Sequence, residues 1–288
     1  MEQDSQRRGS LNVVSQLGRG GLAEAWLVQD QETGQQFVRK RLHCAPELAL
    51  AVEDASSRAF SLLGQLRGFG LRVQMPIEPY RLGEAMCEYI PGELLAEQCV
   101  REGALGDEGL GVKMLRTRKT LAQILDATFE LSGKDLAHCD IRPENMVETP
   151  EGVFLIDTDF TLKAGTYKRR QLHGPVWYAA PEVLEGHPEA SSDLFSVGVS
   201  AWTLLGADLR ERPAAHDLME ERRTGGLYSS FGGRVLGGLK AGIKKIDQPL
   251  VELIDGLVEY DPQNRPNLSD CVAVLGSEHF RPMDQVSA

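Results

Sequence analysis

The stretch HCDIRPENMV, residues 138–147, carries the most specific pattern in this sequence. Asp140 is followed five residues later by Asn145, and Pro143 stands between them. Proline fixes one backbone dihedral angle, so this spacing predicts a rigid loop. Such a loop can present the Asp140 carboxylate to a hydroxyl group and the Asn145 side-chain oxygen to a metal ion. A capped loop with a purely structural role explains the same residues, and we interpret His138 as a packing residue of this loop.

The segment that follows, GVFLIDTDF at residues 152–160, predicts a strand over Val153–Asp157. Asp157 and Asp159 lie two positions apart at the end of this strand, so they can share one face. Either carboxylate is placed to hold Mg²⁺. An acidic turn without a metal is the alternative interpretation.

A glycine-containing turn is expected near the start of the chain, in LGRGGLAEAWLV at residues 17–28. Gly18 and Gly20 are small residues whose N–H groups could surround phosphate oxygens. Lys40 ends the strand-like FVRK, residues 37–40, and would supply a positive charge for phosphate if it points inward. Taken separately, a glycine-rich turn is more often an ordinary hairpin, and an isolated strand lysine is usually exposed to solvent.

The composition excludes several classes of protein. The 288 residues are 42% hydrophobic and 25% charged, which is enough apolar material for an extensive core. The net charge of −11 repels phosphate backbones and anionic lipid surfaces, so neither nucleic acid nor a membrane is an expected partner. The five cysteines form no CxxC pair and indicate neither a disulfide framework nor a zinc site. Residues 1–10 lack a secretory signal, and the apolar residues 195–207 are too few to span a bilayer, so a cytoplasmic protein is predicted.

Residues 11–90 have mostly strand-like character and predict a small lobe with an antiparallel sheet and one helix. ETG at residues 32–34 predicts the hairpin turn between two of the strands, and residues 46–66 have apolar positions at helical spacing. Residues 1–10 are expected to form a flexible tail. The expected strands are residues 11–17, 25–29, 36–42 and 85–90.

Residues 91–288 have mainly helical periodicity and predict a larger second lobe, in which residues 153–157 form one clear strand. Together the two lobes predict an α+β fold. Residues 210–245, which are rich in glycine and arginine, receive no assignment. The expected helices are residues 114–131, 191–205 and 250–260.

From about Leu11 to Leu275 the sequence resembles the eukaryotic-like (Hanks-type) protein kinase family, because its motifs occur in the family's order. The resemblance implies a two-lobed kinase fold and the cofactors ATP and Mg²⁺ or Mn²⁺. The phosphate loop of the family matches Gly18 and Gly20, with Ala23 at the third glycine position, and the third-strand lysine matches Lys40.

The segment MCEYIPGE, residues 86–93, is similar to the hinge that binds the adenine edge of ATP. The resemblance implies that backbone groups of Glu88 and Ile90 contact the adenine. Cys87 stands in the gatekeeper position.

The stretch at residues 138–147 is similar to the family's catalytic loop. The resemblance makes Asp140 the base that accepts the hydroxyl proton and Arg142 the counterpart of a lysine that contacts phosphate. It makes Asn145 a metal ligand, and it implies that Asp193 orients the loop.

Two motifs of the second lobe are also matched. YAAPEVLEG, residues 178–186, is similar to the motif that closes the activation segment, and DPQNRP, residues 261–266, supplies Arg265. The resemblance implies an ion pair between Arg265 and Glu182.

Several positions depart from the family pattern. The helix glutamate that pairs with the strand lysine is replaced by Ala59, and Glu53 and Asp54 are the nearest acids on that helix. The metal-binding DFG motif reads DTDF, so Asp157 and Asp159 both remain candidates for the metal ligand, with Asp157 favoured.

The activation segment also departs from the pattern. Cys139 replaces the arginine that would pair with an activation-loop phosphate, which argues against switching by phosphorylation through this pocket. Pro175 stands where Ser/Thr-selective members have a threonine, and residues 168–170 form a short basic run that could dock an acidic peptide.

The resemblance implies a bacterial-type serine/threonine protein kinase with a protein substrate or a regulatory protein partner. A pseudokinase acting as a nucleotide-binding or scaffold module is the alternative, motivated by Ala59 and the irregular DTDF motif. A small-molecule kinase, or an enzyme that transfers a nucleotidyl group, is a further alternative.

Overall fold

A computed structural model describes residues 11–67, 70–103, 110–166, 177–206 and 247–280. The chain divides into two units. Unit 1 contains the residues up to Gly68, Gln74–Pro91 and Asp157–Thr161, and unit 2 contains Phe69–Val73, Gly92–Ile156 and Leu162–Ala288.

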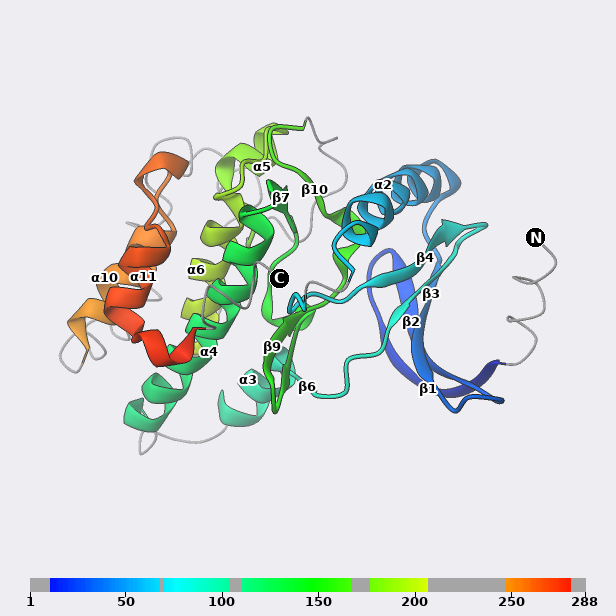
Figure 1. Cartoon of the computed structure of the whole chain (residues 1–288), viewed down its shortest axis with the longest axis horizontal. Coiled ribbons are helices and arrows are strands. Elements are labelled where there is room, and N and C mark those ends of the chain that lie inside the picture. Colours follow the sequence, from blue (N-terminus) through cyan, green and yellow to red (C-terminus); the bar gives the residue numbers. More distant parts are fainter. Residues whose placement is uncertain (1–10, 68–69, 104–109, 167–176, 207–246, 281–288) are drawn as a thin grey trace. The chain divides into compact units, whose positions relative to one another are not determined.

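Unit 1 is built on an antiparallel five-stranded sheet in the order β1-β2-β3-β5-β4 (Figure 1). The one long helix among its described residues is α2 (Pro46–Gly64), and the single-turn 3-10 helix η3 (Thr158–Phe160) packs against α2 and β4. The strands are β1 (Leu11–Arg19), β2 (Ala23–Asp30), β3 (Gln36–Leu42), β4 (Pro76–Arg81) and β5 (Glu84–Glu88).

Local sequence explains these elements. The β2–β3 turn forms because the Asp30 side chain accepts hydrogen bonds from the N–H groups of Glu32 and Thr33, while Gly34 adopts a positive φ of 72°. Helix α2 begins with Pro46 at a position where no N–H is needed. Its buried residues recur three or four positions apart and form one apolar stripe: Val52, Ala55, Ser56, Ala59 and Leu63.

Unit 2 is mainly helical and carries two small sheets (Figure 1). The sheets pair β10 with β7 and arrange β6, β8 and β9 in the order β6-β8-β9. The helices among its described residues are α3 (Leu95–Gly103), α4 (Leu110–Ser132), α5 (Pro181–Glu185), α6 (Ser192–Leu204), α10 (Gln248–Leu257) and α11 (Leu268–Leu275). The strands are β6 (Glu93–Leu94), β7 (Leu136–Ala137), β8 (Met146–Thr149), β9 (Gly152–Leu155) and β10 (Leu162–Lys163).

The α+β fold class predicted from the sequence is confirmed. Two short segments cross the expected boundary at residues 90 and 91. Residues 69–73 belong to unit 2 because Val73 bridges to Leu155 on β9, and residues 157–161 belong to unit 1 because η3 packs on α2. Among the described helices none has the length and apolar character needed to cross a bilayer.

Candidate active site

The Lys40 side chain lies inside unit 1 and is held by two carboxylates. Val38 and Lys40 alternate with Arg39 along β3, so Val38 and Lys40 share the buried face of the sheet. The Lys40 Nζ lies 2.8 Å from Asp157 Oδ1 and 2.6 Å from Asp159 Oδ2. Lys40 is therefore a buried cation with fixed partners and not a solvated surface lysine.

The pKa directions follow from this geometry. Burial alone lowers the pKa of Lys40, but Asp157 and Asp159 more than offset this, and the pKa lies well above its ordinary value. Burial raises the pKa of the Asp159 carboxyl, Lys40 opposes that rise and Asp157 adds to it. Lys40 is thus charged at neutral pH, and one positive charge faces two acidic groups.

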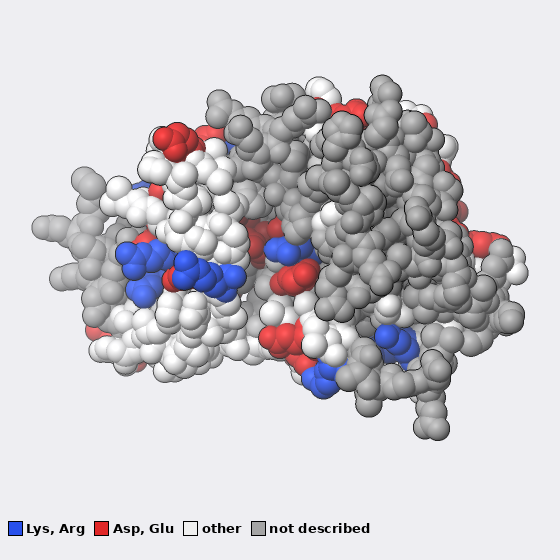
Figure 2. Space-filling view, turned by 180° about the vertical axis from the view of Figure 1, so that it is seen from behind, with Lys and Arg blue, Asp and Glu red and all other residues white. Residues whose placement is uncertain are grey.

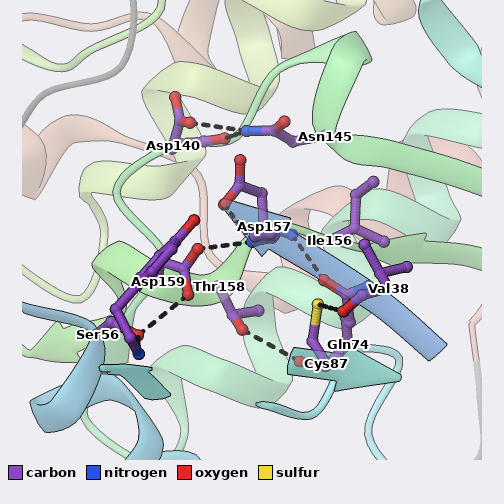
Figure 3. A network of polar contacts seen from close by, with 12 residues as sticks. Val38, Ser56, Gln74, Cys87, Asp140, Asn145, Ile156, Asp157, Thr158 and Asp159 are labelled. Carbon is purple, nitrogen blue, oxygen red and sulfur yellow. Dashed lines mark hydrogen bonds and ion pairs between the residues drawn. The ribbon is translucent and has the colours of Figure 1, made fainter. Parts of the chain in front are cut away.

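Asp157 combines an unusual backbone with an accessible side chain. Its φ of 61° and ψ of 56° are left-handed, and its N–H donates to Gln74 Oε1 over 3.1 Å (Figure 3). The next residue, Thr158, donates through Oγ1 to the Gln74 carbonyl over 3.1 Å. The Asp157 side chain is 37% exposed, whereas that of Asp159 is 11% exposed. Asp157 therefore presents its carboxylate to the surroundings, and Asp159 does not.

Packing does not require glycine at positions 18 and 20, at the end of β1 and in the turn to β2. A Cβ placed at Gly18 would meet nothing within 4 Å, and one at Gly20 would meet only the Ala23 carbonyl, at 3.7 Å. The Gly20 N–H donates to that carbonyl over 2.9 Å. The Gly20 amide is therefore hydrogen-bonded within the turn.

The hinge segment is similarly engaged at Glu88. The Glu88 N–H donates to the Met75 carbonyl over 3.0 Å, and the Glu88 carbonyl accepts from Gln74 Nε2 over 2.6 Å. Ile90 is half-buried. Cys87 is buried, and its Sγ lies 3.8 Å from the Val38 carbonyl.

In unit 2, Asp193 holds the loop that follows β7. The N–H groups of His138 and Cys139 donate to the two Asp193 carboxylate oxygens over 2.5 and 2.9 Å. Asp193 is buried at the start of α6. His138 is fully buried, with Nε2 3.1 Å from the Ile156 carbonyl, as expected for a packing residue. Cys139 has a φ of 65°, which turns the chain sharply before Asp140.

Asp140 and Asn145 lie together in this loop (Figure 3). Asn145 Nδ2 donates to the Asp140 carbonyl over 2.9 Å and to Asp140 Oδ2 over 2.7 Å. Arg142 Nε lies 3.4 Å from the other carboxylate oxygen, Oδ1. Since its amide nitrogen is used twice within the loop, Asn145 keeps its oxygen for a different partner.

A buried ion pair connects α5 with the segment after η4 (Pro262–Asn264). Arg265 Nη1 and Nη2 lie 2.6 and 3.0 Å from the two Glu182 oxygens. The Arg265 side chain is 0% exposed, and its guanidinium lies over the Phe195 ring at 5.4 Å. Ser192 Oγ adds a hydrogen bond of 2.6 Å to Glu182.

A family model described as protein kinase domain matches residues 11–275. The chain belongs to the protein kinase domain family. The match covers both units, including the Lys40 strand and the Asp140 loop.

Three protein kinases illustrate the similarity. CBL-interacting protein kinase 21 of Oryza sativa subsp. japonica is 27% identical over 212 residues, which is 70% of this chain and 39% of the relative. Probable serine/threonine-protein kinase pknA2 of Bifidobacterium longum is 27% identical over 207 residues, 68% of this chain and 26% of the relative. The phosphorylase b kinase gamma catalytic chain, liver/testis isoform, of Mus musculus is 30% identical over 207 residues, 66% of this chain and 49% of the relative. The chain thus spans less than half the length of these relatives.

The structure clarifies the departure on α2 from the protein kinase pattern. Glu53 accepts a hydrogen bond from the Gly83 N–H over 2.7 Å, and Asp54 pairs with Arg58 on the helix surface. Neither acid is a partner of Lys40. Ser56 contacts the lysine's carboxylate pair instead, since its Oγ donates to Asp159 Oδ1 over 3.3 Å.

Sequence reasoning missed Ser56. The signal available was its position: it is a small polar residue inside the apolar stripe of α2, where a buried hydroxyl needs a hydrogen-bond partner. The expectations for Pro175, for the basic run at residues 168–170 and for residues 210–245 lie outside the described residues.

Proposed function

We propose that this chain transfers the γ-phosphoryl group of ATP to a serine or threonine hydroxyl of a protein, as a kinase of the bacterial Hanks type. The observation that carries the proposal is the Asp140 carboxylate. It is buried, fixed by the Asn145 amide at 2.7 Å, and flanked by the Arg142 cation at 3.4 Å. Such a carboxylate can accept the proton of a substrate hydroxyl, and the cation beside it suits an incoming phosphate.

The remaining roles follow from residue chemistry. Lys40 would bind the phosphates of ATP through its fixed charge, and the backbone around Gly18, Gly20 and Ala23 would cover them. Open space at Gly18 supports this, because nothing in the described protein lies where its Cβ would be. Glu88 and Ile90 would contact the adenine through their backbones. At Glu88 the carbonyl, with its second lone pair, is the available group.

The donor set fits a magnesium or manganese ion. Protein kinases use ATP with such an ion, which neutralises charge on the phosphates. Mg²⁺ prefers carboxylate and carbonyl oxygens, and each unit offers a group of this kind: the partly exposed Asp157 carboxylate in unit 1 and the Asn145 amide oxygen in unit 2. Asp157 is our choice of metal ligand over Asp159. Both carboxylates contact Lys40, but the Asp157 side chain is 37% exposed and that of Asp159 is 11% exposed.

We propose a cellular location and protein partners together with this activity. All five cysteines are free thiols, which supports a reducing cytoplasm. Plant relatives are named CBL-interacting kinases, and relatives from Bifidobacterium and Corynebacterium are named serine/threonine-protein kinases. By analogy, a regulatory protein partner is proposed in addition to the protein substrate.

Incubation with γ-labelled ATP tests the function. Wild type and Asp140→Asn are compared with Mg²⁺ and then Mn²⁺, for label on the chain itself and on a generic basic protein. We expect label in the wild type and at least a hundredfold less in the variant, since general-base catalysis contributes about 10²–10⁴-fold. No label from folded wild type would point to a pseudokinase, and a mass increase of AMP would indicate nucleotidyl transfer instead.

A further inference from the structure

Lys40 has a partner that the family pattern does not provide. In protein kinases the strand lysine is held by a glutamate of the helix in the first lobe, and the third position of DFG is glycine. Here α2 sends no acid to Lys40, and the third position of the corresponding DTD triplet is Asp159. Asp159 Oδ2 makes the shorter of the two contacts with Lys40 Nζ, at 2.6 Å.

We propose that Asp159 is the positioning residue for Lys40, taking over the task of the missing helix glutamate from a different segment of the chain. The carboxylate comes from η3, directly after Asp157, and not from α2. The inference rests on the proposed function only in assuming that Lys40 binds phosphate.

The link to α2 is retained through a hydroxyl group. Ser56 Oγ donates to Asp159 Oδ1 over 3.3 Å (Figure 3). The same Oγ accepts from the Tyr80 N–H over 3.3 Å. Ser56 is 1% exposed. The helix therefore acts on the lysine through Ser56 and Asp159 in series, and the serine aligns the carboxylate that in turn aligns the ammonium group.

The two carboxylates are suited to different tasks. Asp159, at 11% side-chain exposure, is enclosed by Lys40 and Ser56, whereas the Asp157 side chain, at 37%, is more accessible. A positioning group benefits from enclosure because its rotamer is then fixed. A metal ligand needs access to the ion and its waters. Both carboxylates contact Lys40, but the more enclosed Asp159 suits the positioning task and the more accessible Asp157 suits a metal ligand.

Chemical labelling of Lys40 tests the contact without any turnover. Nucleotide-free wild type, Asp159→Asn and Asp54→Asn are treated briefly with an amine-acylating reagent at pH 9, and the Lys40 peptide is quantified by mass spectrometry. Asp54 is the matched control because it is an exposed acid of α2, with a side-chain exposure of 68%. We expect labelling at least threefold faster in Asp159→Asn only, and equal rates in all three proteins would overturn the proposal.

Kinetics separate the two carboxylates. We expect Asp159→Asn to lower kcat by about 10- to 100-fold, the usual effect of a misplaced catalytic group, at an unchanged Mg²⁺ requirement. Asp157→Asn should instead raise the Mg²⁺ concentration needed for half-maximal rate. Wild-type or higher kcat in Asp159→Asn would show that the contact restrains the enzyme, and would overturn the proposal.

A rescue experiment moves the carboxylate from position 159 to position 56 and measures whether kcat recovers. Glutamate at position 56 is long enough to replace the serine hydroxyl and extend toward the lysine, so Ser56→Glu should recover part of the kcat lost in Asp159→Ala. Ser57→Glu is the control, since Ser57 is the exposed neighbour on the same helix. Recovery by both changes or by neither would overturn the proposal, with circular dichroism confirming that each variant is folded. If even wild type transfers no phosphate, the proposed function fails, and the labelling of Lys40 still decides this inference.

Discussion

Two residues of the candidate site, Cys139 and Asp157, hold left-handed backbones, with φ angles of 65° and 61°. For a residue other than glycine this conformation costs of order 1–3 kcal/mol and persists only where neighbours impose it. Asp193 imposes it at Cys139 through two hydrogen bonds, and Gln74 accepts the N–H of Asp157. At both places the turn sets the direction of a carboxylate that the proposed reaction uses.

The buried thiol of Cys87 is expected to react slowly with alkylating reagents. Burial raises the pKa of this thiol to about 12, with Lys40 opposing the rise and Asp159 adding to it. At pH 8 only about one molecule in 10⁴ carries the reactive thiolate. We expect a short treatment with iodoacetamide to leave Cys87 unmodified in the folded protein, at a rate that rises about tenfold per pH unit while the fold persists. Peptide mass spectrometry, with urea-unfolded protein as the control, measures this, and rapid labelling at pH 8 would contradict it.

The sequence predicted some residues of the candidate site, but it could not predict contacts that depend on how side chains are enclosed. The strand character of FVRK made Lys40 a candidate for an inward position, with a solvent-exposed lysine as the alternative, and the 138–147 motif suggested that Asp140 and Asn145 act in one loop. The sequence favoured Asp157 over Asp159 but kept both, because the two carboxylates lie near Lys40 and differ in enclosure, which depends on α2. Ser56 was missed for the same reason.

At the scale of elements, helix α6 packs against α10 at a glycine. A Cβ on Gly198 would lie 2.6 Å from Val258 Cγ1 and 2.8 Å from Leu257 Cβ. Real Cβ atoms do not approach that closely, so the two helices can meet only because position 198 has no side chain. The periodicity of residues 191–205 predicted the helix, but it could not show which face needed a glycine.

A pair of glycine substitutions tests this contact. Gly198→Ala should destabilise the protein by about 1–3 kcal/mol through overpacking, although alanine favours helices. Gly256→Ala is the matched control on α10, where the new Cβ would lie 3.6 Å from Pro266 Cδ, an ordinary contact. The control should be neutral or stabilising by up to about 1 kcal/mol. Urea unfolding measures both, and equal midpoints would contradict the packing argument.

The ion pair between α5 and the segment after η4 yields a second prediction at this scale. Arg265→Leu leaves the buried Glu182 carboxylate without its cation and should cost about 3–5 kcal/mol of unfolding free energy. Adding Glu182→Leu removes the unpaired charge, so the double variant should be less destabilised than the sum of the single variants. A double-mutant cycle by chemical denaturation checks this, and additive losses would refute the coupling.

The molecule as a whole carries more acidic than basic side chains. Lys and Arg side chains occur beside Asp and Glu side chains on the face shown in Figure 2, while the complete sequence carries a net charge of −11. A field of this sign favours basic substrates at long range.

A comparison of peptide substrates tests this effect. A basic serine peptide should have a KM several-fold lower than an acidic peptide of the same length in about 0.05 M salt, and the difference should shrink in about 0.5 M salt. Steady-state phosphorylation assays with a neutral peptide as the control measure it. A preference for the acidic peptide would contradict the argument.

The whole-molecule architecture was the most predictable level, because strand and helix periodicities extend over many residues and errors at single positions average out. The boundaries between the two units were less predictable. A single cut at residue 90 could not anticipate that residues 69–73 and 157–161 belong to the opposite units, since both assignments depend on contacts between segments far apart in the chain.

Because residues 157–161 belong to unit 1, the completion of this unit depends on the order in which the chain is synthesised. Lys40 is joined to carboxylates that lie 117 and 119 positions later in the chain. At about 5–20 residues per second, a ribosome needs on the order of ten seconds to deliver them after it has delivered the lysine. During that interval the nascent chain contains the residues of the five strands and of α2 but not the two carboxylates that hold Lys40 in the final structure. Unit 1 can therefore reach its final structure only after much of unit 2 has been translated.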